Sequence, residues 1–486
     1  MSVTTRLRPG PPLTRVGGSE VALALGLSWA VGFSFLGWLA MMSVLPYQGY
    51  GLAAMVAAFI ILPAIGLWCV AKAGSQGGGF LGLLVVVVIL FSDLSLRGFS
   101  GKLDAQSAVK FALWTSGLLL LPWQVGVIRA ARSDLPTFAL LLFGLWALVT
   151  TAYSITPLYT FAAALGFLGF WVLALVFATS LDTARGLFWL TSILLAMSSA
   201  SLLYYIVAPE TAMVIYESAT VRRLGGIYGN PNQVGETAAL ALLLAYLAWF
   251  HLRARASLLL LLVALPVCAA CMLLSQSRTS MLGLGAAISV VLLRRYPVLL
   301  LPTISIGAAA GAVVYAYPDA IDVLIGLVAR SGNVAQVTTF TGRTEIWQFV
   351  MSAIEKAPLL GYGFASTKEL IPAGHSFGYG WTTNSAHNLW LQAWVTTGAV
   401  GLMVILVSQF GALKALVMKP LPIRDGVLSY VVFVGLLESG PVGPTVSVLT
   451  FLWIWATAQS LSANPAGRRV NVAAQTRTHP DQGGPQ

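Results

Sequence analysis

Charged residues are scarce in this sequence. Only 9% of the 486 residues are Asp, Glu, Lys or Arg, whereas 58% are hydrophobic and the mean hydropathy is +0.84. A soluble protein carries charge on about a quarter of its residues, because its surface must be hydrated. The composition therefore excludes a string of soluble domains. Repeated apolar runs of roughly 17 to 25 residues indicate an integral membrane protein instead.

Cysteine is also rare, and its placement excludes the usual cysteine chemistry. Cys69, Cys268 and Cys271 all lie within apolar runs. The last two have the spacing of a redox or zinc motif, but their neighbours are Ala, Leu and Val, and the other ligands of a zinc site are missing. We interpret both thiols as packing residues.

Motifs that bring metal ions or nucleotides to phosphate-bearing substrates are absent as well. The sequence contains no Asp-x-Asp motif, no acidic pair in the first external loop and no Walker-type loop. ATP-driven or metal-dependent transfer is therefore not expected. We expect no metal site and no cofactor.

The apolar runs predict an all-α integral membrane protein with about 12–14 transmembrane helices. The thirteenth run is short, and the third and tenth are marginal. The first is too long for a signal peptide and a second follows closely, so we expect it to be retained as a helix. The predicted spans are 21–45, 51–71, 79–96, 108–128, 137–153, 158–180, 186–207, 233–252, 257–275, 279–293, 298–317, 388–411, 427–440 and 444–461.

Lys and Arg predict the orientation of these spans. If the N-terminus is cytoplasmic and the spans alternate, 17 of the 27 basic residues and 5 of the 16 acidic residues fall on the cytoplasmic side. Cytoplasmic loops are enriched in Lys and Arg. We therefore predict that both termini are cytoplasmic. The formal net charge of +11 is interpreted as a topology signal rather than as a nucleic-acid-binding surface.

This topology divides the chain into six predicted parts. Two external segments are long enough for chemistry, and the longer one, of about 70 residues, is unusual enough to suggest function. The parts are a cytoplasmic N-terminal segment (1–20), N-terminal transmembrane helices (21–207), transmembrane helices with external arginine motifs (208–317), a large external loop (318–387), C-terminal transmembrane helices (388–462) and a disordered cytoplasmic tail (463–486).

The first candidate motif precedes the eighth predicted span and reads Arg222-Arg223-Leu-Gly-Gly-Ile-Tyr-Gly-Asn230-Pro-Asn232. Its glycines permit a close approach to the backbone, and Asn-Pro-Asn favours a helix start with Asn230 or Asn232 as the cap. The arginines either anchor the chain at lipid headgroups or bind substrate. Anchoring is more typical of the cytoplasmic side, so we favour substrate binding.

Arg278 lies between two spans that are joined by almost no loop, in the sequence Ser-Gln-Ser-Arg. It is therefore predicted at or just below the outer membrane surface. An arginine at that depth is costly without a partner, which favours a functional role. Snorkelling of the side chain to the headgroups is the alternative.

Arg343 opens an amphipathic stretch of the large external loop, Gly-Arg-Thr-Glu-Ile-Trp. An arginine in the first turn of a helix has the wrong sign for the helix dipole. It becomes favourable if the arginine and the helix N-terminus bind one anion together. Pairing with an internal partner such as Glu345 is the alternative.

His387 is the most informative of the four histidines in the chain. It lies where the external loop enters the twelfth predicted span, beside Asn384 and Asn388. A lone histidine is usually structural, but this position near external arginines favours a general base. The residues expected to shape the site are Asn230, Asn232, Asn384 and Asn388.

Together these residues suggest a phosphate-bearing substrate. Arginine presents a planar fork that fits phosphate oxygens. A lipid diphosphate would hold its charge at the headgroup level, where Arg223, Arg278 and Arg343 are predicted to lie. His387 would accept a proton from an attacking hydroxyl, and the arginines would stabilise the departing diphosphate.

In these motifs the sequence resembles the O-antigen ligase and polysaccharide polymerase superfamily of bacterial membrane proteins. The resemblance implies a GT-C-like helical fold with one large periplasmic loop, in the bacterial inner membrane. It also implies metal-independent, inverting transfer of a glycan from undecaprenyl diphosphate at an active site facing the periplasm. The matching stretches are Arg-Leu-Gly-Gly-Ile-Tyr-Gly-Asn-Pro-Asn (223–232), Ser-Gln-Ser-Arg (275–278), Gly-Arg-Thr-Glu-Ile-Trp (342–347), Leu-Leu-Gly-Tyr-Gly-Phe (359–364) and Ala-His-Asn-Leu-Trp-Leu-Gln (386–392).

The resemblance also implies roles for single residues. Arg223 and Arg278 look like diphosphate-binding arginines, and His387 looks like the catalytic histidine. Arg343 matches the Gly-Arg of the loop and is expected to face the donor. Arg222 is a weaker match, because the family's arginine stands at the position of Arg223.

The acceptor decides between two enzymes with the same donor chemistry. An exopolysaccharide polymerase uses another repeat unit as acceptor, and an O-antigen ligase uses lipid A-core. The long loop and Ala-His-Asn look closest to the polymerase branch. Expected partners are the lipid-linked donor, the acceptor glycan or lipid A-core, the bilayer, a flippase and a chain-length regulator, but no nucleic acid.

A transporter or flippase of a lipid-linked saccharide is the alternative from a different class. Transporters tend to contain inverted repeats and charges near the membrane midplane. This sequence shows no internal repeat, and its candidate residues gather at one surface. An enzyme is therefore favoured over a conduit.

Overall fold

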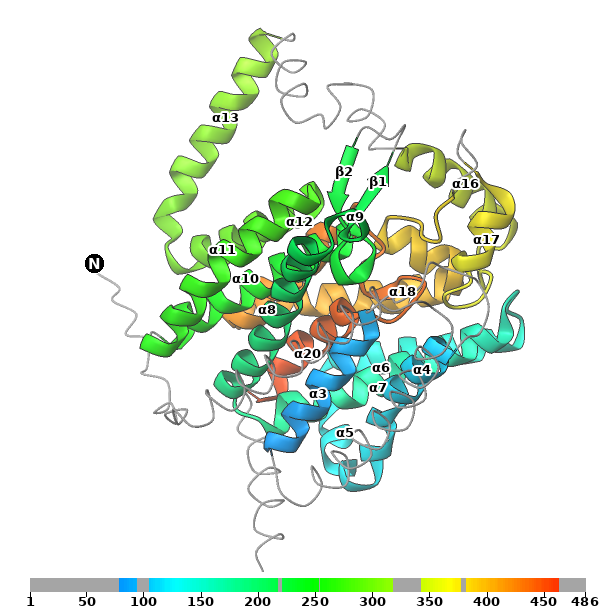
Figure 1. Cartoon of the computed structure of the whole chain (residues 1–486). Coiled ribbons are helices and arrows are strands. Elements are labelled where there is room, and N and C mark those ends of the chain that lie inside the picture. The colour runs from blue at the N-terminus through cyan, green and yellow to red at the C-terminus, as the bar shows by residue number, and fades with distance from the viewer. Residues whose placement is uncertain are drawn as a thin grey trace, which may run out of the picture.

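The structure of the protein is a computed structural model that describes residues 78–93, 105–216, 221–252, 254–317, 342–376 and 382–462. Within these ranges it consists of helices and a single two-stranded hairpin (Figure 1). Several predictions fall outside the described residues and stay predictions. They are the N-terminal segment 1–20, the spans 21–45 and 51–71, the tail 463–486, and parts of the external loop at 318–341 and 377–381.

Each of the remaining predicted spans coincides with a helix, which confirms the all-α fold. The fourth span is divided between α4 and α5, which are bent by 98° relative to each other. In chain order the helices are α3 (Gly78–Asp93), α4 (Ala105–Ser116), α5 (Val125–Ala131), α6 (Leu135–Val149), α7 (Pro157–Ser180), α8 (Thr183–Val207), α10 (Pro231–Leu252), α11 (Arg255–Ser275), α12 (Arg278–Arg295), α13 (Leu300–Ala316), α18 (Leu389–Met418), α19 (Pro422–Gly435) and α20 (Val448–Ser462).

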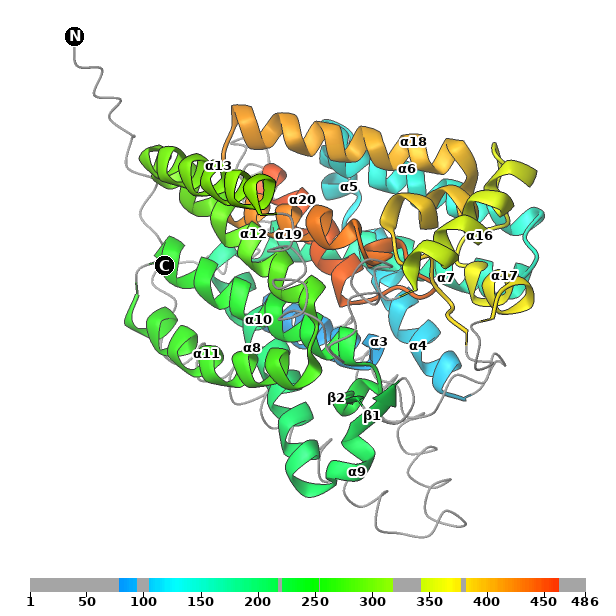
Figure 2. The same ribbon diagram turned by 90° about the horizontal axis from the view of Figure 1, so that it is seen from above.

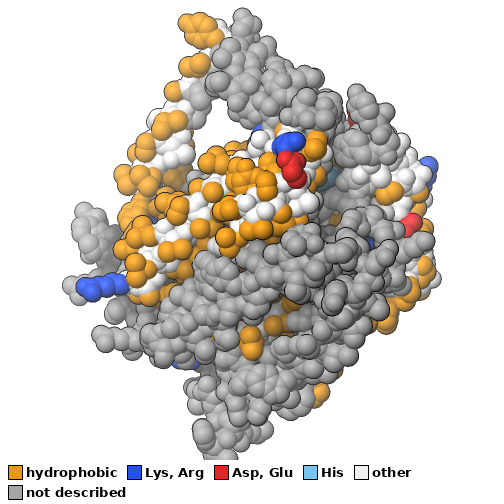
Figure 3. Space-filling model, in the orientation of Figure 1, with side chains coloured by type: hydrophobic (Ala, Val, Ile, Leu, Met, Phe, Trp, Pro, Cys, Tyr) orange, Lys and Arg blue, Asp and Glu red, His pale blue; other side chains and the backbone are white. Residues whose placement is uncertain are grey.

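Six helices of the described residues are long and apolar enough to cross a membrane, or seven if the bent α4–α5 pair forms one span. Other apolar helices, such as α3 and α20, are shorter than a full span, so length alone assigns fewer crossings than the 12–14 predicted. Large hydrophobic side chains are exposed along α11, α13 and α18, as contact with lipid requires. Figure 3 shows them covering α11 and α13. The chain is a multi-pass membrane protein.

The helices pack in two groups that α19 and α20 connect. In one group α10 packs on α8 and α11, and in the other α6 packs on α7 and α18. Figure 2 shows these groups on opposite sides of the bundle. Helix α19 packs on α12 and α20, and α20 packs on α7. The segment that follows α19 is thereby held between the two groups.

The small residue Gly169 brings α4 and α7 unusually close. A Cβ atom at this position would lie 1.9 Å from the carbonyl oxygen of Trp114 in α4. Close helix contacts in membrane proteins commonly depend on such small residues, because they let two backbones approach. A larger side chain at Gly169 would push α4 away from the core.

Part of the predicted external loop forms a second, smaller core. It contains α16 (Arg343–Lys356) and α17 (Thr367–Gly374), which pack on the start of α18. The amphipathic helix expected after Gly342 is confirmed as α16. The buried face of this helix includes Ala353, whereas Met351 is 39% exposed. The buried side chains of this core are Ile346, Val350, Ala353, Ile354, Ile371, Ala386 and Val395.

Residues 359–364 attach this loop unit to the transmembrane core. Two backbone N–H groups of the segment donate to carbonyl oxygens of α18 at 3.0 and 2.8 Å. Gly398, with φ of 68°, breaks α18 beneath the segment, and a Cβ there would lie 2.0 Å from a carbonyl oxygen of the segment. Phe364 packs edge-on against Phe143 and Phe167, with ring centroids 5.7 and 6.2 Å away.

Candidate active site

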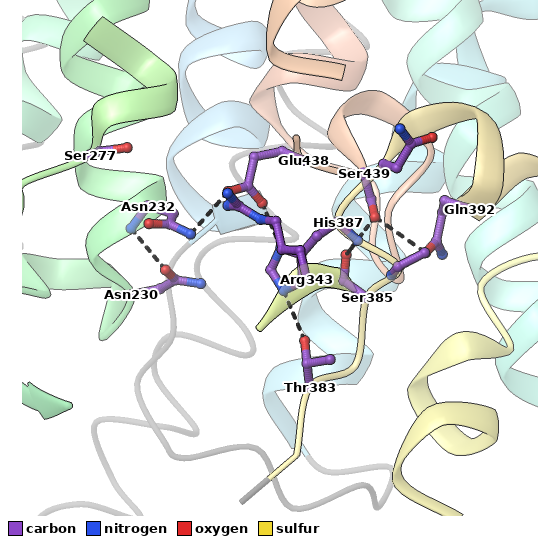
Figure 4. Close-up of polar contacts among 12 residues, drawn as sticks. Asn230, Asn232, Ser277, Arg343, Thr383, Ser385, His387, Gln392, Glu438 and Ser439 are labelled. Carbon is purple, nitrogen blue, oxygen red and sulfur yellow. Dashed lines mark hydrogen bonds and ion pairs between the residues drawn. The ribbon is translucent and has the colours of Figure 1, made fainter. Parts of the chain in front are cut away.

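The predicted site residues gather where six parts of the chain meet at one end of the bundle. These parts are the hairpin of β1 (Met213–Tyr216) and β2 (Val221–Leu224), the starts of α10, α12 and α16, the turn before α18, and the segment after α19. The two external segments predicted to have room for chemistry therefore come together. Figure 4 shows the polar contacts among them.

Strand β2 separates the two neighbouring arginines of the first motif, because successive side chains of a strand point to opposite faces. Arg223 is buried, its Nε donates to the carbonyl oxygen of Ser275 at 2.8 Å, and its Nη2 donates to Asn232 Oδ1 at 2.9 Å. Arg222 is exposed and pairs with Glu210 at 3.3 Å. The structure therefore brings Arg223 into the cluster and leaves Arg222 outside it.

Asn230 and Asn232 have different roles at the start of α10. Asn230 is the cap, because its Oδ1 accepts from the backbone N–H of Asn232 at 2.9 Å and Pro231 is the first helical residue. The side chain of Asn232 is thereby available to the cluster. Its Oδ1 accepts from Arg223, and its Nδ2 donates to Glu438 Oε1 at 3.1 Å. Asn232 thus connects a buried arginine to a carboxylate.

Glu438, three residues beyond the end of α19, is the centre of the cluster (Figure 4). Its Oε1 accepts from Arg343 and Asn232, and its Oε2 lies 2.8 Å from His387 Nδ1. Burial alone would raise the pKa of the Glu438 carboxyl, but the charge of Arg343 and the contacts with His387 and Arg223 hold that pKa below its ordinary value. The carboxylate therefore stays ionised and orients its neighbours.

Sequence reasoning missed Glu438. The sequence motifs that predicted the site contain arginines and a histidine but no pair of carboxylates. A signal was nevertheless present, because Glu438 is an acidic residue at the outer end of an otherwise apolar predicted span, Phe-Val-Gly-Leu-Leu-Glu-Ser-Gly. An ionisable residue in such a place is a functional candidate by default.

His387 is held between a carboxylate and a hydroxyl. Its Nδ1 faces Glu438 Oε2, and its Nε2 lies 3.0 Å from Thr383 Oγ1. An ionised carboxylate only accepts hydrogen bonds, so Nδ1 carries a proton, and in a neutral imidazole the lone pair of Nε2 accepts from the Thr383 hydroxyl. This tautomer is the one that a general base needs when it acts through Nε2.

The backbone of His387 has a φ of 48°, in the left-handed region that non-glycine residues rarely adopt. Surrounding contacts hold this conformation. The Ser385 hydroxyl accepts from the His387 backbone N–H at 3.2 Å, and the fully buried Gln392 accepts from the Ala386 N–H at 2.9 Å. Trp347 of α16 donates to the Ala386 carbonyl oxygen at 3.0 Å. Strained backbone fixed by its surroundings is typical of functional sites.

The two asparagines beside His387 are placed differently. Asn388 is the N-cap of α18, since its Oδ1 accepts from the Leu391 N–H at 2.9 Å. Its Nδ2 donates to the Leu436 carbonyl oxygen at 3.0 Å, which ties α18 to the end of α19. Asn384 is half-buried in the turn between Thr383 and Ser385.

Arg343 and Arg278 are each the first residue of a helix whose N-cap residue provides no side-chain hydrogen bond. The partner of Arg343 is Glu438 rather than Glu345, the internal partner considered from the sequence. An uncapped helix N-terminus beside an arginine is suited to binding an anion. The start of α16 therefore combines an arginine with a helix N-terminus that its N-cap residue does not satisfy.

Arg278 follows Ser277 at the start of α12, next to α10. A Cβ at Gly235 of α10 would lie only 2.2 Å from Ser277 Cβ, so the two helices touch here. Figure 4 shows Ser277 near Asn232. The structure thus places the half-buried Arg278 next to the segments that carry Arg223 and Asn232.

Neither cysteine chemistry nor a metal cluster is evident in the described part of the chain. Cys268 and Cys271 are buried in α11, where the Cys271 thiol donates to the carbonyl oxygen of Ser198 at 3.3 Å. Cys69 lies outside the described residues. No group of three or more His, Cys, Asp or Glu side chains among the described residues is arranged to hold a metal ion.

Comparisons with known proteins show which proteins this chain resembles. A family model described as O-antigen ligase matches residues 265–406, a range that contains Arg278, Arg343 and His387. The exopolysaccharide production protein ExoQ of Rhizobium meliloti (strain 1021) is 30% identical over 210 residues, which are 39% of this chain and 47% of ExoQ. The chain therefore spans about half the length of this curated relative.

Proposed function

Because this chain belongs to the O-antigen ligase and polysaccharide polymerase superfamily, we propose that it transfers a glycan from undecaprenyl diphosphate to a sugar hydroxyl. The observation that carries this proposal is the setting of His387, which has a carboxylate at Nδ1 and a hydroxyl at Nε2. Buried Arg223 and helix-opening Arg343 belong to the same cluster, joined through Glu438. A base for the acceptor and cations for the donor thus stand side by side.

His387 acts on the acceptor. A sugar hydroxyl donates its hydrogen bond to Nε2, and its proton moves to Nε2 as the oxygen attacks the anomeric carbon. Glu438 stabilises the imidazolium that forms and keeps the ring in position, as the carboxylate does in a catalytic triad. General base catalysis of this kind contributes roughly 10²- to 10⁴-fold to a rate.

Arg223, Arg278 and Arg343 act on the donor. The bond between the anomeric carbon and the diphosphate oxygen breaks, and the departing diphosphate gains negative charge. Arginine forks and the uncapped N-termini of α12 and α16 stabilise that charge. Glu438 offsets only part of the positive charge around it, which leaves the remainder for the diphosphate. This direct displacement inverts the sugar carbon, and it requires neither a metal ion nor a cofactor.

The acceptor is proposed to be another repeat unit, so that the protein acts as an exopolysaccharide polymerase. The name of ExoQ refers to exopolysaccharide production, which supports this branch. An O-antigen ligase, with lipid A-core as acceptor, uses the same donor site and is the alternative. A transporter is less well supported, because the cluster residues come from helix starts, turns and a strand rather than from the middles of spans.

The proposed location is the bacterial inner membrane, with both termini in the cytoplasm and the cluster at the periplasmic surface. Under the alternating topology, the segments that meet in the cluster all lie on one side of the membrane. Undecaprenyl diphosphate would insert its lipid tail beside the helices. Its headgroup would then lie at the level of Arg278 and Arg343.

The test compares a deletion strain with strains that carry His387→Ala or, as a matched control, His375→Ala. His375 belongs to the same external loop but stacks on Phe349, outside the cluster. Secreted polysaccharide, lipopolysaccharide and lipid-linked intermediates are measured together. A polymerase loses polymer in the deletion and His387→Ala strains only, retains single repeat units on the lipid carrier and keeps normal lipopolysaccharide.

Other outcomes separate the alternatives. Long polymer stranded on the lipid carrier beside bare lipid A-core identifies a ligase. Normal polymer from His387→Ala protein, present in the membrane at wild-type level, contradicts the role of His387 in either enzyme. Normal lipid-linked glycans and polymer in the deletion strain contradict the proposed function as a whole.

A further inference from the structure

On the basis of the function assigned above to His387, we propose that the Thr383 hydroxyl is a placeholder for the acceptor. It occupies the lone pair of His387 Nε2 until an acceptor hydroxyl displaces it. In the empty enzyme this contact prevents the base from activating water, so Thr383 determines whether the donor glycan is transferred or hydrolysed. Thr383 is a positioning residue in this scheme.

The contact reproduces the one that an acceptor must make. Thr383 Oγ1 lies 3.0 Å from Nε2, within the distance at which a general base takes a proton from a hydroxyl. Glu438 accepts from Nδ1, so in the neutral imidazole that a general base requires, the Thr383 hydroxyl is the donor in the bond to Nε2. A secondary alcohol of a residue thus occupies the place that a secondary alcohol of a sugar would take.

The two partners differ in how firmly they are held. The imidazole of His387 is fixed by Glu438 and by the strained turn around it. The Thr383 hydroxyl can leave by rotation about one side-chain bond, a motion between staggered rotamers that leaves the backbone in place. The side chain of His387 is 23% exposed, so an acceptor can reach it.

The neighbouring Thr382 directs its hydroxyl elsewhere. This hydroxyl donates to the carbonyl oxygen of His375, at the end of α17, at 2.8 Å. The two threonines therefore carry the same hydroxyl one residue apart, and the hydroxyl of Thr383 is the one bonded to His387. Thr382 thus provides a control for the loss of a threonine hydroxyl at this place in the chain.

The side reaction that Thr383 suppresses follows directly from the proposed chemistry. Water would donate to a vacant Nε2, lose its proton to that nitrogen and attack the anomeric carbon through its oxygen. The bond to the diphosphate oxygen would break, giving free reducing glycan and undecaprenyl diphosphate. With the Thr383 hydroxyl on Nε2, water must compete for the base with a hydroxyl that is already in place.

The experiment uses the full chain purified into nanodiscs, with lipid-linked glycan extracted from the deletion strain as the probe. Thr383→Val removes the hydroxyl and keeps the shape, Thr383→Ser keeps the hydroxyl, and Thr382→Val is the matched control one residue away. The readout is free reducing glycan released per glycosidic linkage formed. Size-exclusion profiles check that each variant is folded.

Thr383→Val is expected to raise this ratio roughly three- to tenfold, the change that one hydrogen bond of ordinary strength produces. Thr383→Ser and Thr382→Val are expected to keep the wild-type ratio. Three results overturn the proposal: an unchanged ratio in folded Thr383→Val, an equal rise in Thr382→Val, and a loss of transfer in Thr383→Val that Thr383→Ser restores. The last would make Thr383 an obligatory proton relay instead.

Failure of this inference is distinguishable from failure of the proposed function. His387→Ala is expected to abolish both transfer and hydrolysis in the same assay. If His387→Ala retains both, His387 is not the base and the proposed mechanism is wrong. If it loses both while Thr383→Val behaves as wild type, only the role of Thr383 is wrong.

Discussion

Two buried ion-pair sites lie near opposite ends of α19, and they are built differently. Near its start, Arg424 and Asp425 pair with both side chains only 2% exposed. Arg424 also donates to the Lys419 carbonyl oxygen at 2.7 Å, and Asp425 accepts from the Leu421 N–H at 2.9 Å. Beyond the other end of α19, Glu438 contacts side chains from three other segments and remains 16% exposed.

The difference distinguishes an ion pair that supports the fold from one that is suited to function. The Arg424–Asp425 pair is formed by neighbours in sequence, and its other hydrogen bonds go to two backbone groups and to the hydroxyl of Ser460. The Glu438 cluster collects groups from distant parts of the chain, includes a strained residue and leaves its histidine partly exposed. Only the second arrangement can exchange a protein partner for a substrate group.

The largest expected effect comes from replacing the centre of the cluster. Glu438→Gln removes the charge that orients His387, and its amide can donate to Nδ1 and so place the ring proton on Nε2. Transfer is expected to fall by roughly 10²- to 10⁴-fold, as much as loss of a general base. The rate at which the protein in nanodiscs forms glycosidic linkages measures this fall in transfer. A Glu438→Gln protein that is folded and fully active would remove the distinction between the two sites.

The matched change at the other site should alter stability instead. Asp425→Asn leaves the Arg424 guanidinium buried without its counter-charge, which typically costs about 3–5 kcal/mol. Thermal unfolding in detergent is expected to shift to lower temperature, with less folded protein recovered. Transfer per folded molecule should be unchanged. A loss of rate in the folded fraction would show that this site also serves the reaction.

A smaller effect is expected from changing the shape of a cation and keeping its charge. Arg343→Lys loses the planar fork that contacts Glu438 and, in the proposed mechanism, the diphosphate. Transfer should fall roughly tenfold, since a charge-assisted hydrogen bond is lost. Arg424→Lys provides the comparison at the other site, and its transfer rate per folded molecule should match wild type. Steady-state rates at varied donor concentration measure both.

The smallest effect is expected at Arg222, the arginine that β2 directs away from the cluster. Its pair with Glu210 is exposed, and such pairs contribute little to stability. Arg222→Ala should therefore leave transfer and thermal unfolding close to wild type, whereas Arg223→Ala should reduce both. Equal loss of transfer in the two variants would contradict the assignment of Arg223 alone to the cluster.

Local sequence patterns predicted much of this structure. Hydrophobic runs located most helices of the described residues. Asn-Pro-Asn identified the start of α10, but it left the cap open between Asn230 and Asn232. The sequence also indicated that Arg343 and His387 lie at the starts of helices or next to them, because charged residues are rare in this chain. Each of these predictions depends on neighbours in sequence.

Features of the site that depend on long-range contacts could not be predicted from the sequence. The role of Glu438 depends on its contacts with Arg343 and His387, which are 95 and 51 residues away in the sequence. The choice between Arg222 and Arg223 depends on a four-residue strand that is too short to show alternation. Arg424, counted as one basic residue of the cytoplasmic face, proved to be half of an internal pair.

The glycine break in α18 has a consequence for protein engineering. Gly398 divides the helix into a short part that continues the loop unit and a long part that faces lipid. The loop unit has its own buried core and is attached to the membrane body by residues 359–364, with Phe364 packed against Phe143. The stretch from Gly342 to Gly398 is therefore suited to exchange between related proteins, and chimaeras joined at these two glycines would carry Arg343 and His387 together with the core that positions them.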